Sequence, residues 1–84
     1  MEIEQILSVA KKYDNALLNM GVSEIIRENE NTESLSHIRW MLNEIPNQLK
    51  ENKIEKANRW LGFIQGVLWV RKISTIHELK DDNR

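Results

Sequence analysis

Two histidines, His37 and His77, are the side chains of this chain best suited to acid–base chemistry or metal binding near neutral pH. A metal site needs further ligands at helical spacing, and neither histidine has such neighbours, so the sequence predicts no metal site. Ser34 stands one helical turn before His37, but no third residue is placed to complete a nucleophilic triad.

Two pairs of carboxylates offer a second kind of chemistry. Glu30 with Glu33 and Glu78 with Asp81 could hold magnesium, as in all-α nucleotide pyrophosphohydrolases, if both pairs lay on facing helices. The first pair falls in a polar stretch that we expect to be a loop. The second pair ends at Asp81, within residues 81–84, which we expect to fray. The chain also has no glycine-rich phosphate loop. The sequence therefore predicts no catalytic residue, no cofactor and no enzyme activity.

Arginine and tryptophan are the residues that suggest binding. Arg39-Trp40 and Arg59-Trp60 repeat the same pair in two expected helices, and Trp69 follows on the second of them. These residue types dominate protein-binding hot spots, and they can also stack on a base and hold a phosphate. The alternative is that the tryptophans are core residues and the arginines pair with glutamates. We predict all five as anchors for a protein or ligand, provided that they are exposed.

Residues 59–70 form a nearly continuous apolar run that contains two glycines four positions apart. On a helix Gly62 and Gly66 share one face, where another backbone can approach closely. That backbone could belong to the same chain or to a second molecule. Because the helix is apolar on two sides, we expect a homo-oligomer, a dimer or higher, with an interface at Gly62, Phe63, Gly66 and Val67.

These residues must be positioned by helices, because apolar residues recur at helical spacing and no stretch alternates as a strand does. The chain has only one proline and three glycines. The sequence predicts an all-α fold, a small bundle of three main helices plus a short C-terminal helical turn, in a single domain over residues 1–84. The expected helices cover residues 2–20, 33–52 and 53–72.

Polar residues and glycine mark the expected ends of the first two helices. Gly21 either ends the first helix, so that Ser23 caps a further short helix, or lies inside one longer helix. Residues 28–33 are all polar and predict a loop. Asn31 or Thr32 is then the expected cap of the second helix.

Three further residues mark breaks in the second half. Pro46 predicts a kink or a restart inside the second helix. Asn52 with Glu55 resembles a capping box for the third helix, and Thr75 with Glu78 forms one for the last turn.

Composition narrows the classes of function. The 84 residues include no cysteine, which excludes disulfides and thiolate zinc sites, and the net charge of −1 does not favour nucleic-acid binding. The apolar run is too short for a bilayer, which takes about 20 residues, and the acidic N-terminal segment is unlike a signal peptide, so we expect no membrane contact and a cytoplasmic location. In so small a chain the three tryptophans are expected to supply much of the core.

The second half of the chain, residues 35–84, resembles a group of small, mostly uncharacterised proteins encoded by tailed bacteriophages and prophages. The resemblance is carried by His37-Ile-Arg-Trp-Met, by Thr75-Ile-His-Glu-Leu-Lys and most specifically by Arg59-Trp-Leu-Gly-Phe-Ile-Gln-Gly. No established catalytic residue comes with this group.

The resemblance implies a phage accessory protein in the cytoplasm of the bacterial host. Such a protein is expected to bind and inhibit a host or defence protein. The alternatives are an oligomeric sponge that sequesters a signalling nucleotide, held by arginines between subunits, and a purely structural or assembly protein.

Overall fold

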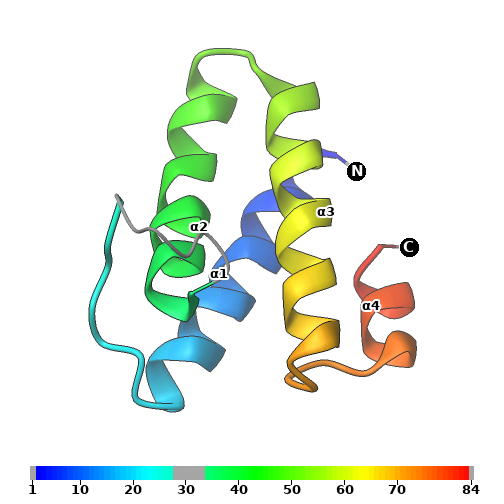
Figure 1. The fold of residues 1–84 in the computed structure, drawn as a ribbon. Helices are drawn as coiled ribbons and strands as arrows, with labels where there is room; N and C mark the ends of the chain where they lie inside the picture. Colours follow the sequence, from blue (N-terminus) through cyan, green and yellow to red (C-terminus); the bar gives the residue numbers. More distant parts are fainter. Residues whose placement is uncertain (1, 28–33, 84) are drawn as a thin grey trace.

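The computed structural model describes residues 2–27 and 34–83, which form four helices and no strand (Figure 1). This confirms the predicted all-α bundle of three main helices with a short C-terminal helix. The helices are α1 (Ile3–Asn19), α2 (Leu35–Lys50), α3 (Ile54–Val70) and α4 (Ile76–Asp82).

The helices α2 and α3 run antiparallel, side by side, and are joined by a short turn (Figure 1). The helix α1 packs against both of them, behind the pair in this view, and α4 lies beside the C-terminal half of α3. The three long helices thus meet on one shared core, and one side of the α2–α3 pair faces away from α1.

The core is aliphatic, which corrects the expectation that tryptophans supply much of it. Trp40 and Trp60 are only partly buried, and Trp69 is exposed. Each tryptophan stands beside the stripe of residues that faces the neighbouring helices, so isoleucine and leucine fill the centre. The largest fully buried side chains are Ile6, Leu17, Ile38, Ile45, Leu61, Ile64 and Leu68.

Gly21 ends α1, as one of the two predictions for it states. It adopts a φ of +93°, and its N–H donates to Leu18 O while the N–H of Val22 donates to Leu17 O, each at 3.0 Å. This pair of bonds is the Schellman motif, which needs a left-handed residue after the helix. No helix follows at Ser23, so both the further short helix and the longer helix through Gly21 were wrong predictions.

The same motif ends α2 at Asn52 and α3 at Lys72, which have φ values of 62° and 60°. Asn52 was predicted as the cap that starts α3, and this was wrong. Its N–H donates to Leu49 O at 3.1 Å and the N–H of Lys53 donates to Gln48 O at 2.8 Å, so Asn52 closes the preceding helix. Lys53 is the N-cap of α3, without a capping side-chain hydrogen bond.

The second helix begins later than expected and does not restart. Its N-cap is Ser34, whose hydroxyl accepts from His37 N, so the prediction of Asn31 or Thr32 as the cap was wrong. The predicted loop at 28–33 lies outside the described residues. The helix continues through Pro46, because Ile45 and Leu49 on either side of it are buried and keep their places in the core only if the helix runs on.

The last turn is more firmly held than expected. The capping box of Thr75 and Glu78 is present, which confirms that prediction. The expectation that residues 81–84 fray was wrong for the described residues 81–83, because α4 includes Asp82 and this carboxylate bonds to α1.

Candidate functional site

Arg39 links α2 to α1. It was predicted as a binding anchor only if exposed, and it is not exposed. Its side chain is buried and donates two hydrogen bonds to the carboxylate of Asp14, at 2.7 and 3.0 Å, and one to Val22 O at 3.0 Å. The bonds to Asp14 raise the pKa of the guanidinium. The predicted pairing of arginine with a glutamate is thus replaced by an aspartate of another helix.

Trp40 and Trp60 do face each other across α2 and α3, with ring centroids 5.5 Å apart. A cation lies over each ring: Arg27 at 5.6 Å from the Trp40 centroid and Lys56 at 5.5 Å from the Trp60 centroid. The arginines of the two Arg-Trp pairs lie apart, since Arg39 bonds to Asp14 of α1 whereas Arg59 is exposed. Arg59 instead lines a shallow hollow of about 320 Å³ with His37, Trp40, Met41, Trp60 and Phe63.

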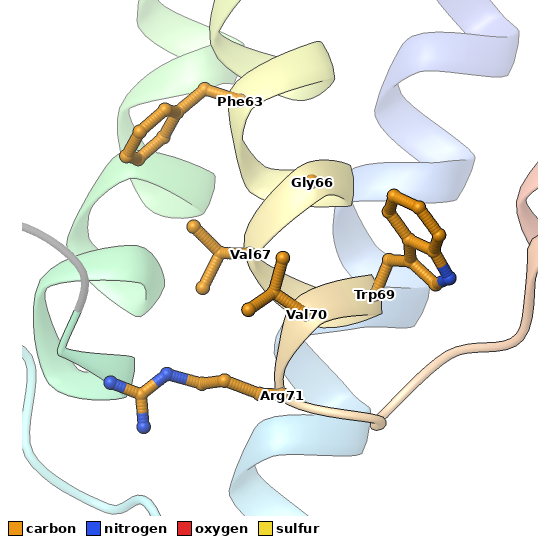
Figure 2. Close-up of a pocket in the computed structure, with 6 residues that line it drawn as sticks. All are labelled: Phe63, Gly66, Val67, Trp69, Val70 and Arg71. Carbon is orange, nitrogen blue, oxygen red and sulfur yellow. The ribbon is translucent and has the colours of Figure 1, made fainter.

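Six residues of α3 form an exposed surface that we name the α3 apolar face: Gly62, Phe63, Gly66, Val67, Trp69 and Val70. Phe63, Trp69 and Val70 are 44, 54 and 75% exposed, and Val67 is partly exposed. Figure 2 shows Phe63 and Trp69 on opposite sides of the helix, with Gly66, Val67 and Val70 between them. Together with Arg71, five of the six residues line a hollow of about 380 Å³.

The two glycines open onto empty space. A Cβ atom added at Gly62 or Gly66 would have nothing within 4 Å among the described residues. Close packing against another helix of the same chain, one of the two predicted reasons for the glycine spacing, is therefore wrong. The other reason, an interface with a second molecule, stays a prediction.

Cations lie at the two ends of the α3 apolar face: Arg59 shares a hollow with Phe63, and Arg71 lines the hollow of the face itself. Arg59, Arg71 and Lys72 are exposed, and α3 carries no acidic residue after Glu55. The face therefore combines an apolar centre with a positive rim at its two ends.

Sequence reasoning missed a polar cluster that fastens α4 to α1 and α3. The Tyr13 hydroxyl donates to Asp82 Oδ2 at 2.7 Å and accepts from Gln65 Nε2 at 3.1 Å, and Lys12 pairs with Asp82 Oδ1 at 2.7 Å. Burial, followed by the bond to Asp82, raises the pKa of Tyr13. Gln65 interrupts the apolar run of residues 59–70, and this polar residue was the one signal in the sequence.

The residues suited to acid–base chemistry lie apart. His37 bonds through Nδ1 to Arg27 O at 2.9 Å, and His77 is exposed. Glu78 serves the capping box, while Glu30 and Glu33 lie outside the described residues. Within the described ranges, no group of three or more histidine or carboxylate side chains could hold a metal ion.

None of the helices in the described part of the chain has the length and apolar character needed to cross a membrane. Comparison of the chain with protein-family models, with curated proteins and with solved structures finds no match. The geometry of the α3 apolar face is therefore the main physical indication of what the chain does.

Proposed function

We propose that this chain is a non-enzymatic binding protein whose α3 apolar face docks onto a helix of another protein. One observation carries the proposal: large apolar side chains gather on the outer side of one helix although the bundle has an aliphatic core of its own. Contiguous exposed apolar surface of this kind marks interaction sites in small soluble domains.

The glycines favour a helix as the docking element. Gly62 and Gly66 lie one turn apart, and no atom of the described part of the chain comes within 4 Å of a Cβ placed at either, so a partner backbone can come close at these positions. Phe63 and Val70 lie beside the glycines, and their exposed side chains can pack against the side chains of the docked helix. Packing of an amphipathic helix into an apolar depression is a common mode of peptide recognition.

Charge complementarity favours an acidic partner. Carboxylates that flank the partner's apolar stripe would meet Arg59 at one end of the face and Arg71 at the other. A second copy of this chain would instead bring its own cations toward the same rim. We therefore assign the face to a partner protein, and the predicted homo-oligomer is the alternative occupant.

The resemblance of residues 35–84 to small phage proteins supports a host or defence protein as the partner, bound and inhibited in the bacterial cytoplasm. Of the predicted anchors, Trp69 belongs to the α3 apolar face and Arg59 to its rim. The nucleotide sponge has less support, because Arg39 is engaged by Asp14 and is not free to hold a phosphate. A purely structural role would follow if only copies of the chain occupied the face.

Two synthetic helical peptides test the proposal. The first carries a stripe of leucine and alanine flanked by glutamates, and the second has lysines in place of the glutamates. We expect the acidic peptide to bind and to shift the indole N–H signal of Trp69, and the basic peptide not to bind. Native mass spectrometry of the chain alone reports at the same time whether a second copy already covers the face.

A substitution that fills the hollow supplies the matched variant. A Cβ at residue 66 has no atom of the described residues within 4 Å, and leucine is a good helix former, so Gly66→Leu should keep the fold while the peptide loses at least about tenfold in affinity. Ser8→Leu, at an exposed position of α1, is the control and should bind as the unchanged chain does. Equal binding of both peptides, or a dimer that Gly66→Leu dissociates, would contradict the assignment to an acidic partner.

A further inference from the structure

A second hollow lies in the groove between α2 and α3, near the turn that joins them, and shares no residue with the α3 apolar face. Its volume of about 630 Å³ falls within the range of small-molecule pockets. The lining comes from the C-terminal half of α2, the N-terminal half of α3 and the segment before α2: Arg27, Trp40, Glu44, Asn47, Gln48, Lys50, Glu51, Lys53, Lys56 and Trp60.

The charge of this hollow is positive. Four of its residues are cations and two are carboxylates, and one of each is already joined in the ion pair of Lys53 with Glu51 at 3.0 Å. None of the ion pairs within the described residues includes Lys50 or Lys56. An anion entering the groove therefore meets lysines that have no carboxylate partner there.

Gln48 supplies an independent sign of a ligand. Its side chain lines the hollow and is only 6% exposed, and its Oε1 receives no hydrogen bond from the described residues. A buried amide oxygen without a donor destabilises the fold. Gln65, the other buried glutamine of the bundle, is by contrast bonded to both Tyr13 and Asn83.

The start of α3 adds a second feature at the same place. This helix of 17 residues begins at Ile54 without any side chain capping its first N–H groups, and Lys53 and Lys56 flank that end. Uncapped N–H groups and the helix dipole both favour a negative charge there.

We propose that the α2–α3 groove binds a small organic anion that also carries a hydrogen-bond donor. The phosphate or carboxylate group lies between Lys50 and Lys56, the lysines of the lining that are not in an ion pair with a described residue, and the donor bonds to Gln48 Oε1. The ring faces of Trp40 and Trp60 carry Arg27 and Lys56, so the two rings act as apolar walls of the groove and not as stacking platforms.

The three tryptophans allow a direct test by NMR of their indole N–H groups. Inorganic phosphate, adenosine monophosphate and citrate are titrated to millimolar concentration against sodium chloride at matched ionic strength. We expect saturable shifts of the Trp40 and Trp60 signals and no shift of Trp69, which lies outside the groove. Tighter binding of adenosine monophosphate identifies a phosphate ester, and tighter binding of citrate a carboxylate. Shifts no larger than those with chloride would overturn the proposal.

Two glutamine variants separate a ligand role from a structural one. Gln48→Leu removes an unsatisfied group, so it should raise Tm by about 4 °C or more and weaken binding of the probes at least about tenfold. Gln65→Leu breaks satisfied bonds and should lower Tm. Lys56→Gln gives a second readout, a loss of anion binding with little change in Tm. If Gln48→Leu lowers Tm as Gln65→Leu does, or binds the probes unchanged, the inference is wrong.

Discussion

The hydroxyl of Tyr13 in the first helix donates to the carboxylate of Asp82 in the last, at 2.7 Å and across 69 positions of sequence. The same carboxylate pairs with Lys12, and the backbone oxygen of Asp82 accepts from Gln5 at 3.0 Å. One residue thus holds α4 on the bundle through three groups of α1. The C-terminal turn is part of the folded structure and not an appendage to it.

Tyr13→Phe is expected to destabilise the chain by about 2 kcal/mol, because a partly buried hydrogen bond to a charged acceptor is lost. Urea denaturation measures the change. Lys12→Ala, which removes a largely exposed partner of the same carboxylate, is the control and should cost under about 1 kcal/mol. Equal losses of stability in the two variants would show that the Tyr13 hydroxyl contributes no more than the exposed ion pair does.

Alkaline pH should reduce the difference in stability between the unchanged chain and Tyr13→Phe. Burial and the bond to Asp82 raise the pKa of Tyr13, whereas the unfolded chain ionises near its ordinary value of about 10. The contribution of the hydroxyl is therefore complete below pH of about 10 and is lost as pH rises above it. The stability gap between the unchanged chain and Tyr13→Phe should therefore be constant up to about pH 9 and should narrow as the pH rises from about 10 to about 12. A gap that already closes below about pH 9 would contradict the raised pKa.

The Asp14–Arg39 pair predicts a larger effect. Asp14→Ala leaves a buried guanidinium with only backbone acceptors and should cost about 3 kcal/mol, measured by thermal or urea unfolding. Glu51→Ala breaks an exposed pair and should cost under about 0.5 kcal/mol. If Asp14→Ala proves as mild as Glu51→Ala, Arg39 has found other partners or water.

The helix ends give a prediction of opposite signs. Lys72 holds a left-handed φ that costs a lysine energy, so Lys72→Gly should stabilise the chain by about 0.5–1 kcal/mol. Gly21→Ala imposes the same strain where glycine now avoids it and should cost about 1 kcal/mol. No neighbour crowds Gly21, so the cost there is conformational. Urea unfolding of both variants compares the signs directly.

The glycines of α3 should behave differently from Gly21. Both have room for a methyl group and ordinary helical backbone, so Gly62→Ala and Gly66→Ala should each stabilise the isolated chain by about 0.5–1 kcal/mol. The same substitutions should weaken docking of the acidic peptide, since they hold its backbone away. A loss of stability instead would mean that a second copy already packs on these glycines.

Helical periodicity was enough to predict the fold class and, within a few residues, the three long helices, because each buries one apolar stripe. The ends were less predictable, because Asn52 has a residue type suited both to starting a helix and to ending one. Only the short connection between α2 and α3 decides between the two, by placing Asn52 after Lys50 in a Schellman motif.

The candidate site was predictable in part for a similar reason. Arg39 and Arg59 look alike in sequence, because each precedes a tryptophan. In the structure Arg39 is paired with Asp14 of another helix, whereas Arg59 is exposed. Gln48 showed no signal at all, since a polar residue in a helix is ordinarily exposed. Its burial follows from the way α2 and α3 lie together.

The bond between Tyr13 and Asp82 also has a consequence for synthesis of the chain. Ribosomes add roughly 5–20 residues per second, so the acceptor for Tyr13 is made several seconds after α1 itself. During that interval α1 can pack on the nascent α2 and α3, but its hydroxyl has no carboxylate to receive it. A nascent chain that stalls before residue 82 therefore stays easier to unfold and more open to proteases than the finished one.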